Sequence, residues 1–367
     1  MKIEKIVLKK IELSMKNPFR TKRGSLTSRP LIIVEARDDT GLTGYGEVTA
    51  FPDPFYTYET TSTAWHVLED FLIPLFAENT LSHPEQVPEI LDSIQGHPMA
   101  KAGLEGAVWD LYAKQKDRSL ASLIGGTRKS VRAGAVLSLS DHIEQDISDL
   151  QEEGYERYKL KIIKGKEQEM IEKVRASSPD LPIMIDGNGQ YDETDMDHLA
   201  ALDRYGMLMI EQPFRAGDFH LHQQLQKRMR TPICLDESIT SFEDAVQAVE
   251  LGSCRIINVK ISRVGGLTAA KKIHDFCAAS GVPVWCGGMV ESGISKAHNL
   301  ALASLSNFSI PGDLSGSARY FESDIVQPPL KVEKGALAVP QYPGIGIDVD
   351  KEKLAEVTQQ SSVHTLS

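Results

Sequence analysis

The sequence of 367 residues contains little cysteine and no long apolar run. Its thiols form no CxxC pair, which argues against a zinc knuckle or a disulfide framework; the four are Cys234, Cys254, Cys277 and Cys286. No run approaches the length of a membrane span, and the alternating N-terminus MKIEKIVLKKIEL lacks the apolar core of a signal peptide. We therefore expect a cytoplasmic protein with reduced thiols and no membrane partner.

The chain has fewer basic than acidic residues: 40 Lys and Arg against 51 Asp and Glu, which gives a net charge of −11. Nucleic acids and anionic membranes select basic surfaces, so neither is expected as a partner. The composition, 41% hydrophobic and 25% charged, is that of an ordinary globular protein. A small molecule is the partner that fits best.

The chain is long enough for two domains, since a parallel barrel of roughly 250 residues would leave about 120 for a second one. Residues 1–125 read as three alternating strands followed by segments with apolar residues at helical spacing, which predicts a small α+β domain. In residues 126–334, eight short apolar runs alternate with helical segments, as in a parallel (β/α) barrel. Residues 335–367 are expected to leave the barrel and rejoin the first domain.

Charged residues end consecutive apolar runs of the predicted barrel at nearly constant intervals. Asp186, Glu211 and Asp236 are 25 residues apart, Lys161 lies 25 residues before the first, and Lys260 lies 24 residues after the last. One strand and one helix with their loops make a repeat of this length, and barrel active sites lie at the carboxyl ends of the strands. The five side chains are therefore expected to meet in the barrel mouth.

The three carboxylates predict a metal site. Oxygen ligands from three neighbouring strands suit a hard divalent cation, so we expect Mg²⁺, for which Mn²⁺ would be a substitute. Asn188 and Glu237, which are close to the ligands in sequence, and Lys159 are expected to support them.

The lysines predict proton transfer. Lys159 and Lys161 share one face of their strand, and a neighbouring like charge together with partial burial would lower the pKa of Lys161. Lys260 would approach the metal from the opposite side. This arrangement suits removal of a proton from carbon next to a carboxylate, with the resulting charge stabilised by the metal.

With these residues in place, the chain resembles the enolase superfamily, muconate-lactonizing subgroup, over nearly its full length. Within it, the likeness is to o-succinylbenzoate synthases that double as N-acylamino acid racemases. The segments that carry the resemblance are PFRT, GYGEV, GHPMAKAGLEGAVWD, YKLKI, IEQP, TPICLDES, NVKISRVGGL, PVWCGGMVESG and NFSIPGD. The resemblance implies a modified TIM barrel of the (β/α)7β type with an N-terminal α+β capping domain.

The resemblance also implies the chemistry of a hydro-lyase. Asp186, Glu211 and Asp236 would bind Mg²⁺, and Lys161 would remove the α-proton and then assist loss of the hydroxyl from the same face. This syn-dehydration through an enediolate forms o-succinylbenzoate in menaquinone biosynthesis, and Lys260 would stabilise the enediolate by its charge. In the alternative, racemisation of N-succinylamino acids, the two lysines would exchange roles as base and acid. The sequence leaves both activities open.

Substrate selection would come from loops of the capping domain and from strand ends. The expected contacts to a small-molecule carboxylate are Phe19, Arg23, Phe51, Tyr56, Val136, Ser138, Met289 and Glu291. Arg23 and Val136 depart from the residues usual in such relatives, so they are expected to affect the distal half of the substrate. We also expect a homo-oligomer.

Rival functions fit the sequence less well. Mandelate racemases would need a His–Asp dyad where this chain has Lys260, and dipeptide epimerases carry an Asp-x-Asp where this chain reads PGDLSG. A Schiff-base aldolase would use Lys161 but would leave the three acids without a role. A barrel kept only for binding would have lost ligands or bases, and none is missing here.

Overall fold

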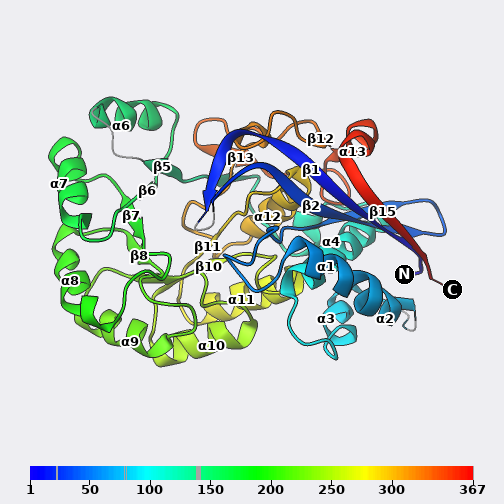
Figure 1. The fold of residues 1–367 in the computed structure, drawn as a ribbon, viewed down its shortest axis with the longest axis horizontal. Helices are drawn as coiled ribbons and strands as arrows, with labels where there is room; N and C mark the ends of the chain where they lie inside the picture. Colours follow the sequence, from blue (N-terminus) through cyan, green and yellow to red (C-terminus); the bar gives the residue numbers. More distant parts are fainter. Residues whose placement is uncertain (22–23, 78, 80, 138–141, 367) are drawn as a thin grey trace.

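The computed structural model describes residues 1–21, 24–77, 79, 81–137 and 142–366. Figure 1 shows a curved parallel sheet with helices along its outer side, next to a twisted antiparallel sheet built mainly from the N-terminal part of the chain. The predicted modified TIM barrel with an N-terminal capping domain is confirmed.

The capping domain is built on a four-stranded antiparallel sheet in the order β15-β1-β2-β3. Its strands are β1 (Ile3–Thr21), β2 (Gly24–Asp38), β3 (Thr43–Val48) and the C-terminal β15 (Thr358–Thr365). β15 pairs with β1 from Lys5↔Thr365 to Ile11↔Thr358, so the end of the chain lies beside its beginning. The domain boundaries themselves stay a prediction.

Helices cover one face of this sheet. They are α1 (Thr61–Val67), the π-helix η1 (Leu68–Leu72), α2 (Ile73–Ala77), the 3-10 turn η2 (Pro84–Gln86), α3 (Val87–Ile90), α4 (Pro98–Gln115) and α5 (Leu120–Leu123). The long helix α4 lies directly on β3, where a Cβ atom at Gly46 would be 2.0 Å from the carbonyl oxygen of Gly103. Only glycine allows the two backbones to approach this closely.

Seven parallel strands form the barrel sheet, in the order β11-β10-β9-β8-β7-β6-β5. They are β5 (Ala135–Leu137), β6 (Tyr158–Leu160), β7 (Ile183–Asp186), β8 (Met209–Glu211), β9 (Ile233–Leu235), β10 (Ile256–Val259) and β11 (Val284–Cys286). Asp186 is the register partner of Glu211. The predicted ligands of β7 and β8 therefore lie at one level of the barrel mouth.

The eighth predicted run, FSIPGD, is not a regular strand. It lies between β11 and β5 through the isolated bridges Val284↔Phe308 and Ala133↔Gly312. Pro311 interrupts it, and proline cannot donate to a strand ladder. The amide of Asp313 donates to the carbonyl of Cys286 at 3.0 Å, which brings the Asp313 side chain to the barrel mouth.

The barrel helices alternate with the strands and lie outside them (Figure 1). They are α6 (Ile143–Glu152), α7 (Glu167–Ser177), α8 (Met196–Ala201), α9 (Phe219–Arg228), α10 (Phe242–Leu251), α11 (Leu267–Ala279) and α12 (Gly293–Ala303), with 3-10 turns η3 (Glu193–Asp195) and η4 (Leu202–Tyr205). Local sequence sets their ends. The Ser241 hydroxyl accepts from the amide of Asp244 to begin α10, and Gly252 ends it in the left-handed region.

Past Asp313 the chain no longer follows the strand–helix alternation. Its elements are η5 (Ser317–Arg319), β12 (Val326–Gln327), β13 (Ala336–Ala338), β14 (Asp348–Val349) and α13 (Lys351–Val357), and β13 pairs with β4 (Ser130–Arg132). Among the helices in the described ranges, none has the length and apolar character needed to cross a membrane.

Candidate active site

A compact apolar layer fills the barrel below the mouth. It consists of Met184, Met209, Cys234, Ile256 and Trp285, one residue from each of five neighbouring strands. Two cations lie close to the Trp285 ring: the guanidinium of Arg157 lies 5.1 Å from the ring centroid and Nζ of Lys159 lies 5.3 Å from it. The cationic groups of Arg157 and Lys159 thus lie against this apolar layer at the base of the site.

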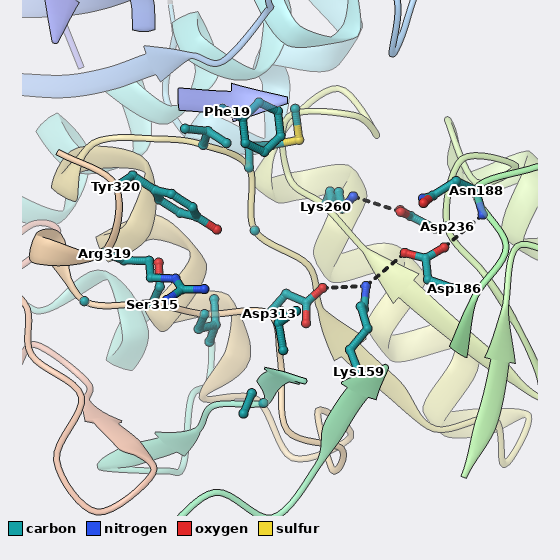
Figure 2. Close-up of a pocket in the computed structure, with 18 of the residues that line it drawn as sticks. Phe19, Lys159, Asp186, Asn188, Asp236, Lys260, Asp313, Ser315, Arg319 and Tyr320 are labelled. Carbon is teal, nitrogen blue, oxygen red and sulfur yellow. Dashed lines mark hydrogen bonds and ion pairs between the residues drawn. The ribbon is translucent and has the colours of Figure 1, made fainter. Parts of the chain in front are cut away.

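Lys159 forms ion pairs with the three carboxylates of Asp186, Glu211 and Asp313, called here the carboxylate cluster. Its Nζ lies 3.1 Å from Asp186, 2.7 Å from Glu211 and 2.8 Å from Asp313; Figure 2 shows it between Asp186 and Asp313. Burial opposes the charge on Lys159, but Asp313, Glu211 and Asp186 together raise its pKa well above the ordinary value. Lys159 therefore serves as a fixed counter-ion.

Glu211 is fully buried at the end of β8. Its Oε1 accepts from Nδ2 of Asn258 at 2.9 Å, whereas its Oε2 contacts Lys159 without a hydrogen bond. Burial and the neighbouring Asp186 raise the pKa of Glu211 well above its ordinary value. One buried oxygen of Glu211 is thus available to a further positive partner.

Asp236 lies between two cations. Lys260 donates to its Oδ2 at 2.9 Å, and Arg263 pairs with its Oδ1. Burial would raise the pKa of Asp236, but Arg263 and Lys260 lower it below its ordinary value. Burial lowers the pKa of Lys260, and Asp236 and the Tyr56 hydroxyl raise it to a value above the ordinary one. Lys260 also donates to the Tyr56 hydroxyl at 3.0 Å, which joins the barrel to the capping domain.

Asn188 and Glu237, two of the three predicted supporting residues, lie at the same rim. The amide of Asn188 donates to Oδ1 of Asp186 at 3.0 Å, and its Nδ2 donates to Glu237 at 3.4 Å. Burial, with Asp236 and Asp186 nearby, raises the pKa of Glu237 to about 7. The second carboxylate oxygen of Glu237 is buried without a hydrogen bond.

The predicted ligands suit a divalent cation chemically. Carboxylates from three neighbouring strand ends, with a buried oxygen of Glu211 that accepts no hydrogen bond, provide the donors that hard cations prefer. As their side chains stand, no three His, Cys, Asp or Glu residues of the described ranges form a ready coordination group. Lys159, Lys260 and Arg263 supply the balancing positive charge instead.

Lys161 departs from the sequence-based expectation. Its amide donates to the carbonyl of Leu137 at 3.0 Å, so its backbone continues the sheet one residue past β6. Its side chain is exposed, and it is not among the described residues that line the cavity. The expected partial burial is therefore wrong, because the strand ends at Leu160 and the lysine begins a surface loop.

A cavity of about 1400 Å³ opens above the cluster. Asp186, Asp236 and Lys260 line it together with five of the predicted substrate contacts, namely Phe19, Phe51, Tyr56, Val136 and Met289. Glu291 does not line it: the side chain is buried behind Met289, whose amide donates to it at 2.7 Å, and burial raises its pKa to about 8. Arg23 and Ser138 lie outside the described residues.

Several charged or polar residues of the site were not predicted from the sequence. Asp313 pairs with Arg157 at 2.6 Å as well as with Lys159. The alternation in RYKLK could have identified Arg157, because it shares a strand face with Lys159. No local pattern pointed to Asn258 or Arg263, whose partners come from neighbouring strands.

Comparison with known families identifies the class of protein. Residues 2–125 match the family model described as mandelate racemase/muconate lactonizing enzyme, N-terminal domain. Residues 142–353 match the model described as enolase C-terminal domain-like. The chain belongs to the mandelate racemase/muconate lactonizing enzyme family of the enolase superfamily.

Individual relatives show which members of the family this chain is similar to. The chain is 48% identical to the o-succinylbenzoate synthase of Bacillus subtilis, over 100% of this chain and 99% of that one. It is 41% identical to an N-succinylamino acid racemase of Amycolatopsis, over 98% of both chains. A solved structure of an enolase superfamily member from Listeria innocua superposes with a TM-score of 0.96 at 43% identity, covering 100% of each chain.

Proposed function

We propose that this chain is a Mg²⁺-dependent o-succinylbenzoate synthase. The observation that carries the proposal is the alignment of Asp186 and Glu211 at the ends of β7 and β8 with Asp236 directly after β9, between Lys159 of β6 and Lys260 directly after β10. The full-length likeness to synthases supports the same reaction. The reaction removes a proton next to a carboxylate and a hydroxyl from the neighbouring carbon, with release of water.

The three carboxylates would hold the cation. When bound, Mg²⁺ supplies positive charge beside the substrate carboxylate, which makes the neighbouring proton more acidic. Lys159 keeps the acids in place by its ion pairs with Asp186 and Glu211. Asn188 and Glu237 would support the same rim.

The lysines would carry the proton. Lys161, as the free amine, would take the proton from the α-carbon, and its ammonium would return that proton to the departing hydroxyl on the same face. The pair of electrons from the broken C–H bond would form the new double bond as the C–O bond breaks. Lys260, on the far side, would stabilise the negative charge that develops.

Racemisation of N-succinylamino acids is the second candidate. Lys161 follows β6 and Lys260 follows β10, so the two would supply an amine for each face of an α-carbon, and the 41% identity to a racemase supports this reading. In this reaction one lysine would remove the α-proton and the other would deliver a proton to the opposite face.

A paired assay tests the proposal. Dehydration of the cyclohexadiene hydroxy acid and deuterium exchange at Cα of N-succinyl and N-acetyl amino acids in D₂O would be measured on the same enzyme preparation. Chelation with EDTA should abolish the activity and Mg²⁺ should restore it. Failure to turn over either substrate class with Mg²⁺ present would overturn the proposal, and the ratio of the two kcat/KM values would assign the main activity.

Three further expectations belong to this proposal: a role in menaquinone biosynthesis, a cytoplasmic location and assembly into a homo-oligomer. A genetic deletion that makes growth depend on added menaquinone would test the first. Light scattering of the purified protein would test the last.

A further inference from the structure

The cavity extends well past the carboxylate cluster. Its volume of about 1400 Å³ exceeds the roughly 300–1,000 Å³ of most small-molecule sites. Ser315, Arg319 and Tyr320 line its other side, and Figure 2 shows them across Asp313 from Asp186 and Asn188. A substrate that reaches from one side to the other needs a second group to interact there.

Arg319 places a positive charge on that far wall. It ends the 3-10 turn η5, and no ion pair joins it to a carboxylate in the portion of the chain that the structure describes. In Figure 2 its guanidinium and the Tyr320 hydroxyl both point into the cavity. Burial raises the pKa of Tyr320, and the nearby charge of Arg319 opposes that rise, so Tyr320 stays a neutral hydrogen-bond donor beside the cation.

A buried lysine holds this wall in place. Nζ of Lys296, on α12, donates to the carbonyl of Gly316 at 3.1 Å and lies 5.7 Å from the Tyr320 ring centroid. The Lys296 side chain is only 2% exposed. The segment that carries Arg319 is also pinned through Ser317, whose amide donates to the carbonyl of Leu330 at 2.8 Å. A wall fixed in this way can bind a ligand without the cost of ordering a loop.

Other charges on the far side do not cancel Arg319. Asp313 is paired with Arg157 and Lys159 at 2.6 and 2.8 Å. Glu153 and Glu333 also line the cavity and are exposed, as Arg319 is, but neither forms an ion pair with Arg319 in the described part of the chain. Lys331 adds another cation to the lining.

We propose that Arg319 and Tyr320 form an anion subsite for the second carboxylate of a dicarboxylate substrate. The inference rests on the proposed function, because both candidate substrate classes carry a succinyl chain that ends in a carboxylate remote from the reacting carbon. The planar guanidinium pairs with such a carboxylate through two N–H groups, and the Tyr320 hydroxyl donates a further hydrogen bond. The subsite therefore selects a succinyl group over an uncharged acyl group of similar length.

The test compares Arg319→Met with the wild-type enzyme on N-succinyl- and N-pentanoyl-L-phenylalanine, which differ at the end of the acyl chain. Exchange at Cα should show kcat/KM for the succinyl substrate reduced roughly 10- to 100-fold, mainly through KM, with less than about a twofold change for the pentanoyl substrate. Arg319→Lys should recover part of the loss. Arg230→Met, at a side chain 94% exposed, is the matched control and should change neither value.

Calorimetric titration with N-succinyl-L-phenylalanine in Mg²⁺ separates the subsite from the reaction. Weaker binding by Arg319→Met than by wild type supports the subsite even if the wild type exchanges no proton, in which case the racemase candidate fails; the proposed function as a whole fails only if dehydration is absent as well. Equal affinity of the two proteins, or equal discrimination between succinyl and pentanoyl substrates, overturns the subsite. Absence of wild-type binding overturns it as well.

Discussion

At the scale of single residues, ionic partners decide what each group in the barrel mouth can do. The motif KLK contains two lysines that a strand would place on one face. Lys159 is enclosed by three carboxylates and keeps its proton, whereas Lys161 lies past the end of β6 and outside that cluster. The first is suited to holding charge, and the second is the lysine proposed to move a proton.

Replacement of either proposed proton-transfer lysine tests this division. Lys161→Ala and Lys260→Ala should each reduce kcat for dehydration by at least about 100-fold while leaving the fold intact, because each removes an acid–base or charge-stabilising group. Steady-state kinetics and circular dichroism check this. Lys164→Ala, in the same loop as Lys161 but paired with Asp195 at 2.6 Å, is the control. Near-normal turnover in either lysine variant would disprove the two-lysine scheme.

The metal ligands allow a separate test. Asp236→Asn removes one proposed ligand charge and should weaken Mg²⁺ affinity about tenfold or more, as measured by calorimetric titration with the ion alone. Glu333→Gln changes a carboxylate that lines the same cavity but is no proposed ligand, so it should retain wild-type affinity. An unchanged dissociation constant in Asp236→Asn would count against the ligand assignment.

At the scale of helices and strands, carboxylates of the capping domain cap helices of the barrel. Glu47 of β3 accepts from the amides of Ser292 and Ser295 at 2.9 and 3.0 Å, at the start of α12. Glu105 of α4 accepts from the amides of Leu267 and Thr268, which begin α11. A helix N-terminus carries partial positive charge and free N–H groups, so each cap attaches one domain to the other.

The burial of Glu105 predicts a pH dependence of stability. Burial raises its pKa from 4.5 to about 7 in the folded protein. The proton therefore binds more tightly to the folded state, and its stabilising contribution is complete below about pH 4.5 and is lost as the pH rises through 7. Relative to Glu105→Gln, the wild type should lose roughly 2 kcal/mol of unfolding free energy between pH 5 and pH 8.

Urea denaturation of both proteins across that range measures the difference. Glu352→Gln provides the control, since Glu352 is an exposed acid in the first turn of α13. A free-energy difference between wild type and Glu105→Gln that stays constant with pH would contradict the pKa shift.

At the scale of the whole molecule, one buried arginine links the two domains around the cavity. Nε of Arg29 on β2 donates to the carbonyl of Val290 beyond β11 at 2.8 Å, and its Nη1 donates to Ala50 at 2.9 Å. Its guanidinium also lies 4.0 Å from the ring centroid of Phe51. Phe51 and Val290 both line the cavity, so this contact shapes the site as well as the interface.

Arg29→Met should therefore affect stability and binding together. It leaves several buried carbonyl groups without donors, which should cost about 3 kcal/mol or more of unfolding free energy. KM should rise because Phe51 and Val290 lose their anchor. Denaturation midpoints and steady-state kinetics check both effects, with the exposed Arg118→Met as control. A wild-type midpoint in Arg29→Met would show that the arginine does not join the domains.

The sequence by itself determined the barrel, the order of its strands and the chemical nature of the site. Apolar runs mark strands, and the interval of 25 residues places Asp186, Glu211 and Asp236 at strand ends without any knowledge of distant contacts. Five of the eight predicted substrate contacts line the cavity, and these contacts were predicted from the resemblance to the enolase superfamily and not from periodicity.

Only the tertiary structure decided which charges meet. The ion pairs of Lys159 with Asp313, and of Asp236 with Arg263, join segments whose approach depends on how the sheet curves. The exposure of Lys161 depends on the residue at which β6 ends, and the place of Arg319 depends on the chain after Asp313, where the repeat stops. Local periodicity fixes where a side chain stands along its own strand, but its partners, burial and charge state are set by neighbours across the barrel.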